Sequence, residues 1–201
     1  MYKIIKKFLI RIYNIKAKII LADLGKGSKI YWPGEVHNGK YMHIGHNCYI
    51  KKYAWLQAIK LTTDKDPCFS MGDGSYINRC CQIVITHNVT IGTNVTIADN
   101  VYIADTTHGY KDVNTPISSQ ALEYVGDVHI GDGTWLGRNV SVLGCSIGKQ
   151  CVVGTGSFVT KDIPDYCVAV GSPARIIKRY NFATKQWEKT DKDGNFILKD
   201  N

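Results

Sequence analysis

The chain has 201 residues, of which 44% are hydrophobic and 21% charged, which fits one folded domain and excludes a disordered polymer. The net charge is +8, but residues 1–24 hold six Lys or Arg against one Asp, which leaves about +3 for the rest. Such a surface does not favour nucleic-acid binding. Seven cysteines without a CxxC pair indicate neither a zinc site nor a disulfide framework, so we expect a cytoplasmic protein.

Residues 1–27 form a basic amphipathic segment. Apolar residues lie close to helical spacing at Ile5, Phe8, Leu9, Ile12, Ile15 and Ile19, and basic residues surround them at Lys3, Lys7, Arg11 and Lys18. Its uncharged runs fall far short of the ~20 apolar residues that cross a bilayer. Residues 1–24 are therefore open to three roles: contact with an anionic membrane surface, a cap on the following domain, or packing on a neighbouring subunit. We favour a cap or packing.

Residues 28–170 carry a repeat of six residues. The repeated aliphatic positions are Ile85, Ile91, Ile97, Ile103, Ile130, Leu136, Val142, Ile147, Val153 and Val159. Weaker repeats extend upstream through Met71, Ile50 and Ile44. A period of six is neither helical nor alternating and is typical of a solenoid. Three hexapeptides should form one triangular coil of about 18 residues, whose aliphatic side chains point inward and are covered by stacking.

Three stretches resemble a known family: IGTNVTIADNVYI, HIGDGTWLGRNVSVL and SIGKQCVVGTGSFVTKDIPDYCVAVGSPARIIK. They are similar to the hexapeptide-repeat acyltransferases, and most similar to the sugar O-acetyltransferases of the galactoside, maltose and polysaccharide-modifying type. The resemblance covers about residues 70–180. It implies an all-β fold, a left-handed parallel β-helix, with acetyl-CoA as co-substrate. It also implies a homotrimer with sites between subunits.

The repeat breaks after Asp105, and a polar excursion spans residues 106–127. A long loop in a compact domain is usually functional or disordered. His108 stands at its base. Hydroxyl groups are weak nucleophiles, and imidazoles, which titrate near neutrality, can remove the proton as the oxygen attacks a thioester. The resemblance implies that His108 is this base, with Asp105 or a backbone carbonyl as the group that orients its ring.

The resemblance also implies residues that contact the acceptor. When the pattern of galactoside-type enzymes is carried over without gaps, their acceptor-binding Asn falls on Asn78. The family's Trp near the acyl-transfer site matches Trp135. An aromatic wall there would exclude water from the thioester. Thr86 stands where those enzymes carry an acidic residue, which argues against galactoside or maltose as the substrate. His87 is a further candidate to line the cleft.

The resemblance assigns a third group of residues to the cofactor. Contacts along an edge of the prism are implied for Gly137, Arg138, Gly154, Thr155, Thr160 and Lys161. In the C-terminal segment, residues 171–201, Arg175 and Lys178 match basic residues that meet the phosphates of coenzyme A. Charge-assisted contacts of this kind suit phosphate groups.

These residues predict an acetyl-CoA-dependent O-acetyltransferase acting on a sugar hydroxyl in bacterial surface polysaccharide biosynthesis. Three alternatives stay open: N-acetylation of a nucleotide-linked amino sugar, acetylation of an antibiotic on the same scaffold, and a non-catalytic scaffold. Zinc carbonic anhydrases share the fold, but the even spacing of His87, His108 and His129 does not match their ligands, and we predict no metal. An acyl-cysteine route is not favoured, because the cysteines fall on repeat positions.

Overall fold

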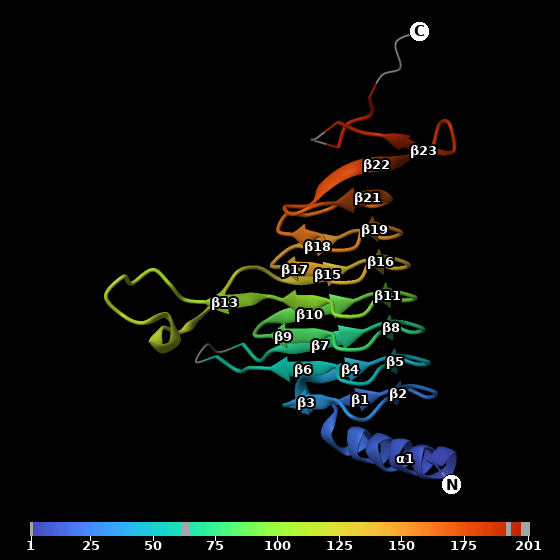
Figure 1. The fold of residues 1–201 in the computed structure, drawn as a ribbon, viewed down its shortest axis with the longest axis vertical. Helices are drawn as coiled ribbons and strands as arrows, with labels where there is room; N and C mark the ends of the chain where they lie inside the picture. Colours follow the sequence, from blue (N-terminus) through green and yellow to red (C-terminus); the bar gives the residue numbers. More distant parts are fainter. Residues whose placement is uncertain (1, 62–64, 192–193, 198–201) are drawn as a thin grey trace.

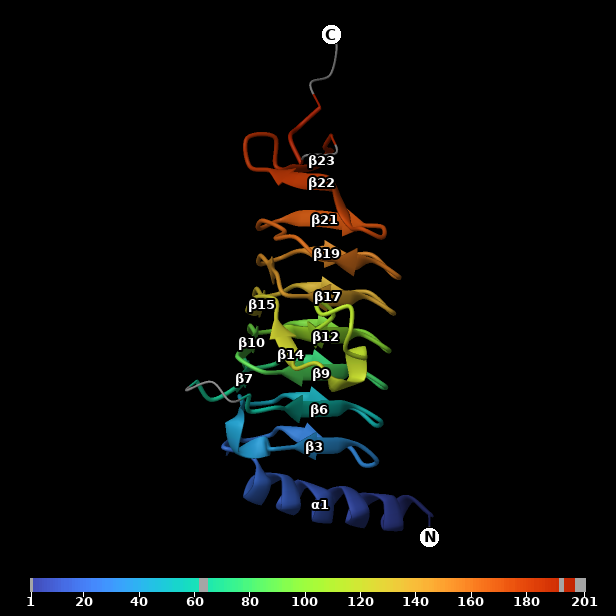
Figure 2. The same cartoon turned by 90° about the vertical axis from the view of Figure 1, so that its left-hand side faces the viewer.

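The computed structural model describes residues 2–61, 65–191 and 194–197, with side chains from residue 8 onward. The chain winds into a three-sided prism in which each coil supplies one strand to each of three parallel sheets, here named A, B and C (Figures 1 and 2). The helix α1 (Tyr2–Ile20) lies across one end of the prism. A hairpin projects from the side of the prism, after the fourth strand of sheet C and before the fifth strand of sheet A (Figure 1).

As far as Val159 the strands follow the chain in rotation through the three sheets, after which Ile163 makes a single bridge to sheet A before the chain returns to sheet B. Sheet A contains β1 (Asp23–Leu24), β4 (Met42–Ile44), β7 (Cys68–Met71), β10 (Asn88–Ile91), β15 (Val128–Ile130) and β18 (Ser146–Ile147). Sheet B contains β2 (Lys29–Ile30), β5 (Tyr49–Ile50), β8 (Tyr76–Ile77), β11 (Thr96–Ile97), β16 (Trp135–Leu136), β19 (Val152–Val153) and β21 (Cys167–Val170). Sheet C contains β3 (Glu35–His37), β6 (Trp55–Ala58), β9 (Gln82–Ile85), β12 (Tyr102–Ala104), β17 (Ser141–Leu143) and β20 (Phe158–Val159). Two short 3-10 helices, η1 (Gly39–Tyr41) and η2 (Ile117–Ser119), lie in connections.

The repeat predicts the core correctly. All ten aliphatic positions of the period are at most 1% exposed, and the weaker upstream positions Ile44, Ile50 and Met71 are at most 2% exposed. They stack in register, as in Ile77 beside Ile97 and Ile97 beside Leu136 along sheet B. Parallel strands this short hold together because every coil continues the hydrogen-bond ladder of the coil before it. The first strand lies at Asp23–Leu24, ahead of residue 28, because α1 leads directly into the first coil.

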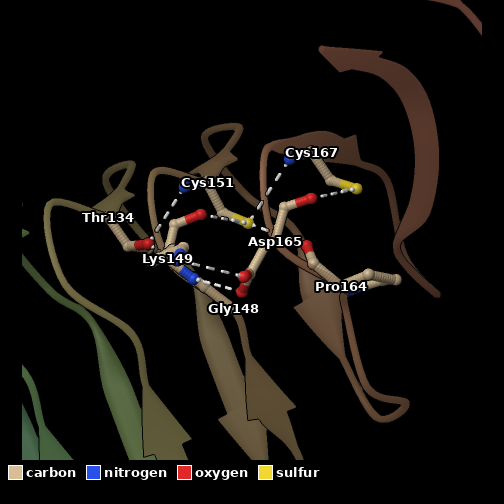
Figure 3. A network of polar contacts seen from close by, with 7 residues as sticks. All are labelled: Thr134, Gly148, Lys149, Cys151, Pro164, Asp165 and Cys167. Carbon is tan, nitrogen blue, oxygen red and sulfur yellow. Dashed lines mark hydrogen bonds and ion pairs between the residues drawn. The ribbon is translucent and has the colours of Figure 1, made fainter. Parts of the chain in front are cut away.

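The corner between sheets A and B explains why small polar residues recur in the repeat. At one position of this corner the hydroxyl or thiol group donates to a carbonyl of the next coil and accepts an N–H from it. Thr134 Oγ1 donates to Gly148 O at 2.7 Å and accepts from Cys151 N at 3.0 Å, and Cys151 Sγ donates to Pro164 O at 3.1 Å (Figure 3). Ser28 and Ser75 make the same pair of contacts lower in the prism. These side chains satisfy corner backbone groups that the sheets leave unpaired.

The helix α1 covers the open end of the prism, which is one of the roles we favoured. It does so with a face other than the apolar stripe seen in the sequence. Tyr13 OH donates to Gly34 O at 2.7 Å, Asn14 exchanges two hydrogen bonds with the backbone of Ile30, and Ala17 is buried. The side chains of Lys3, Ile5 and Lys7 lie outside the described part of the chain. No helix among the described residues combines the length and apolarity needed to cross a bilayer.

The other end of the prism is closed by strands that reverse direction. After β21, the chain turns into β22 (Arg175–Asn181), which pairs antiparallel with β21, and β23 (Gln186–Lys189) pairs antiparallel with β22. Sheet B therefore continues beyond the last coil, and Arg175 and Lys178 lie on this extension.

Replacement of Ile97 by Ala tests the stacked core. Ile97 is fully buried in the middle of sheet B, so the truncation should lower the free energy of unfolding by about 2–5 kcal/mol, measured by denaturant titration. Thr96→Ala is the matched control, because Thr96 is exposed on the same strand and its truncation should change the free energy by less than about 0.5 kcal/mol. Equal effects of the two substitutions would contradict the inward orientation of the repeat.

Candidate functional site

The excursion at residues 106–127 is an ordered hairpin at the corner between sheets C and A. The strand β13 (Thr106–His108) follows β12 almost directly and pairs antiparallel with β14 (Leu122–Tyr124), after which the chain rejoins the prism at β15. Thr106 Oγ1 donates to Glu123 O at 2.9 Å, and Lys111 pairs with Glu123 at 3.1 Å. Figure 1 shows this hairpin standing away from the prism wall.

A buried carboxylate anchors the hairpin to the preceding coil. Asp105 is 0% exposed, and its two oxygens accept hydrogen bonds from the backbone N–H groups of Thr86, His87 and Asn88 at 2.7–3.1 Å and from the Thr86 hydroxyl at 2.9 Å. The expected role of Asp105 in orienting the His108 ring finds no support, because the hydrogen bonds of the described residues join this carboxylate to residues 86–88. Asp105 instead sets the position from which β13 leaves the prism.

Thr86 and His87 complete this corner beneath the hairpin. Thr86 is fully buried and its hydroxyl donates to Asp105, which gives this chain a use for Thr at a position where galactoside-type enzymes carry an acidic residue. His87 is half-buried, its Nδ1 lies 3.2 Å from Thr86 Oγ1, and its ring lies 4.0 Å from the Tyr124 ring, centroid to centroid. His87 therefore packs under β14. The sequence did not predict the contact between His87 and Tyr124, because Tyr124 lies in the excursion at residues 106–127, where no repeat fixes its position.

His108 is exposed at the outer end of β13, opposite Leu122 in the hairpin. It lies at the same corner as His87, between sheets C and A. Its position therefore depends on β13, β14 and the Asp105 anchor.

The corner between sheets B and C gathers another part of the predicted site. Asn78 N donates to Ile97 O at 2.9 Å, Ala98 N to Leu136 O at 3.0 Å, Gly137 N to Val153 O at 2.8 Å, and Gly154 N to Ala169 O at 2.8 Å. These contacts stack Asn78, Ala98, Gly137 and Gly154 along one edge, with Arg138 and Thr155 exposed beside them. The predicted acceptor residue and four of the predicted cofactor residues thus share one edge of the prism.

The two glycines on this edge leave no room for a side chain. A Cβ at Gly137 would lie 2.7 Å from Thr155 N, and one at Gly154 would lie 2.7 Å from Val170 Cγ1. Trp135 stands two residues before Gly137 on the outer face of sheet B, between Thr96 and Val152, and is 47% exposed. The close approach of the next coil therefore requires glycine at both positions, and an exposed aromatic ring flanks them.

The structure places the remaining cofactor candidates in two separate regions. Thr160 and Lys161 follow β20 and lie at the corner between sheets C and A, the corner of His108, while Arg175 and Lys178 are exposed on β22. Within one chain, His108 and Asn78 consequently lie at different corners of the prism.

Five of the seven cysteines are buried in the prism. All seven cysteines are free, and burial raises the pKa of Cys81, Cys145 and Cys151 to about 11. A thiol in that state stays protonated at neutral pH and is a poor nucleophile. Among the described residues, no group of three or more His, Cys, Asp or Glu side chains is placed to hold a metal ion.

Replacement of Asp105 by Ala tests the anchor. The change leaves several buried donors without an acceptor, and each costs about 1–3 kcal/mol, so the free energy of unfolding should fall by at least about 3 kcal/mol. Amide hydrogen exchange at residues 86–88 and along β13 should accelerate. Asp112→Ala is the control, because that carboxylate bonds Thr115 and Asn114 at the exposed tip of the hairpin. If both variants behave alike, Asp105 does not anchor the hairpin.

Comparison with known sequences matches this chain to acetyltransferases. The model described as the hexapeptide repeat of succinyl-transferase matches residues 127–161. A protein of Staphylococcus aureus (strain COL), named by inference as an acetyltransferase, is 38% identical over 123 residues, 61% of this chain and 60% of that protein. WbbJ of Escherichia coli K12, named by inference as a lipopolysaccharide biosynthesis O-acetyltransferase, is 42% identical over 125 residues, 58% of this chain and 63% of that protein. The chain spans about three fifths of the length of these relatives.

Solved structures share the fold. A variant of AntD, an N-acyltransferase from Bacillus cereus, in complex with dTDP-4-amino-4,6-dideoxyglucose and coenzyme A, has a TM-score of 0.71 at 18% identity and covers 86% of this chain and 91% of its own. A maltose O-acetyltransferase from Clostridium difficile has a TM-score of 0.51 at 29% identity and covers 83% of this chain and 73% of its own. The prism is thus a left-handed parallel β-helix, and the chain is similar in sequence and in fold to hexapeptide-repeat acetyltransferases.

Proposed function

We propose that this protein is an acetyl-CoA-dependent O-acetyltransferase that acts on a sugar hydroxyl in bacterial surface polysaccharide biosynthesis. The observation that carries the proposal is the combination of an exposed histidine on an anchored hairpin with the stacked edge that places Asn78 in line with Gly137 and Gly154. The name of WbbJ, a lipopolysaccharide biosynthesis O-acetyltransferase, and the maltose O-acetyltransferase neighbour support a hydroxyl acceptor.

In the proposed mechanism His108 is the general base. It accepts the proton of the acceptor hydroxyl while the oxygen attacks the thioester carbonyl carbon, and it returns that proton to the leaving sulfur as the carbon–sulfur bond breaks. The charge that develops on the carbonyl oxygen needs N–H donors nearby. Trp135, exposed beside the edge, would keep water from the thioester, and Asn78 and His87 would contact the acceptor.

Acetyl-CoA would lie along the corner between sheets B and C, where Gly137, Arg138, Gly154 and Thr155 form one edge. Arg175 and Lys178 on β22 would contact the phosphates. The AntD structure with coenzyme A bound supports a coenzyme A site on this fold.

A homotrimer would bring the two corners, which lie apart within one chain, together between neighbouring chains. The corner between sheets C and A of one chain, with His108, Thr160 and Lys161, would face the corner between sheets B and C of the next, with Asn78 and Gly137. Each site would then contain residues of two chains. We propose that this assembly is cytoplasmic.

N-acetylation of a nucleotide-linked amino sugar is the second candidate. The AntD structure holds dTDP-4-amino-4,6-dideoxyglucose, and AntD is an N-acyltransferase. An amine is nucleophilic once it is neutral and depends less on a general base. Acetylation of an antibiotic remains the third candidate. Only an assay with different acceptors separates it from the other two.

A thiol-release assay with acetyl-CoA tests the proposed function. The acceptor panel should contain saccharides, nucleotide sugars, nucleotide-linked amino sugars and antibiotics. We expect transfer to a sugar hydroxyl and a fall in kcat of at least about 10²-fold in His108→Ala, with acetyl-CoA binding retained by calorimetry. His43→Ala is the control, because His43 is exposed on β4 in the second coil, two coils from the hairpin. Transfer only to amines, with little loss in His108→Ala at high pH, would favour the second candidate.

Mixing two inactive variants tests the shared site. Asn78→Ala and His108→Ala should each be nearly inactive as homotrimers, whereas co-expressed chains should regain activity at least about tenfold, because some interfaces join an intact Asn78 to an intact His108. Light scattering should give about three times the chain mass of 22.4 kDa. Mixed trimers, identified by native mass spectrometry, that stay inactive would overturn a site shared between chains.

A further inference from the structure

The helix α1 presents an apolar stripe to solvent. Phe8 is 62% exposed, and Ile12, Ile15 and Ile19 are 48%, 55% and 78% exposed. Successive residues of a helix are about 100° apart, so these four side chains share an arc of about 60° centred opposite Ala17. We call Phe8, Ile12, Ile15 and Ile19 the outer stripe. Apolar side chains gathered in this way indicate a surface that contacts something other than water.

The helix cannot bury the outer stripe by rolling. Asn14 holds the backbone of Ile30 with two hydrogen bonds, at 3.0 Å from its Nδ2 and 2.9 Å to its Oδ1, and Tyr13 OH bonds Gly34 O. Ala17 is 2% exposed against the first coil. These contacts hold the stripe on the face of the helix that points away from the prism.

Basic residues flank the outer stripe on both sides. Arg11 and Lys18 lie along one side and Lys16 along the other, all exposed. Between α1 and the first coil, a groove of about 850 Å³ is lined by Arg11, Lys18, Lys26 and Lys29, with no acidic residue among its lining. On the Lys16 side, the nearest acid is Glu35, which bonds His37 at 2.9 Å. The sequence has no acidic residue before Asp23.

We propose that α1 lies in the plane of an anionic lipid membrane, with the outer stripe among the acyl chains and the flanking basic residues at the headgroup phosphates. An apolar stripe bordered by Lys and Arg is the pattern of an interfacial helix. A second copy of the helix fits less well, because packing two outer stripes together would bring Arg11, Lys16 and Lys18 of both copies close without any acid to neutralise them.

The proposal gains strength if the proposed trimer forms with its prisms side by side and parallel. All three helices would then lie at one end of the assembly, and three weak membrane contacts would act together. The membrane proposal itself does not require catalysis, so its test is independent of the proposed function.

Co-sedimentation of the full chain with lipid vesicles tests the proposal. We expect binding to vesicles of phosphatidylcholine with 30% phosphatidylglycerol, weak binding to phosphatidylcholine alone, and release as salt rises. Ile12→Ser with Ile15→Ser should weaken binding at least about tenfold. The matched control is Val113→Ser with Ile117→Ser, two apolar residues of the hairpin that are 92% and 56% exposed.

A charge variant separates the two components of binding. Each basic residue near an anionic surface contributes about fivefold in affinity, so Arg11→Gln with Lys18→Gln should weaken binding at least about tenfold, whereas Lys185→Gln with Lys189→Gln should not. Wild-type protein that fails to bind anionic vesicles would overturn the proposal. So would a loss of assembly size in Ile12→Ser with Ile15→Ser, measured by light scattering, because the outer stripe would then contact another copy of the chain.

Discussion

Stacking of one coil on the next is the interaction on which this molecule depends. Strands of two to four residues have no stability alone, but each adds to three parallel ladders whose aliphatic side chains fill the prism interior. The corners extend this pairing through groups such as Thr134 and Cys151, which bond the backbone of the coil above. The hairpin of β13 and β14 is attached to this column as an addition, and it does not interrupt the core.

The repeat was sufficient to predict the prism because one residue in six has to be aliphatic in every coil. Ile85, Ile97 and Leu136 follow that constraint, and all are fully buried. The orientation of α1 followed no such rule. The apolar spacing of Phe8, Ile12 and Ile15 suggested a buried stripe, whereas hydrogen bonds from Tyr13 and Asn14 decide which face meets the first coil. A pattern of hydrophobicity cannot weigh such polar contacts.

The sequence named candidate residues for the site but did not predict how they are arranged. The family resemblance pointed to His108, Asn78 and Gly137, and these residues remain our proposals for catalysis and binding. Topology assigns His108 to one corner of the prism and Asn78 to another, which no spacing along the chain reveals. The use of Asp105 was also hidden, because its partners are backbone N–H groups of residues 86–88, and those carry no sequence signal.

The regular spacing of the coils fixes the distance between features at different levels of the prism. Neighbouring strands of a sheet lie about 4.8 Å apart, and β12, which leads into the hairpin, is three coils beyond β3 of the first coil, so the root of the hairpin stands about 14 Å above the coil that α1 covers. Insertion or loss of one whole coil would change that height by a single step while the contacts within every other coil persist. Related chains with different numbers of coils would therefore present the same hairpin at different heights above the end of the prism that α1 covers.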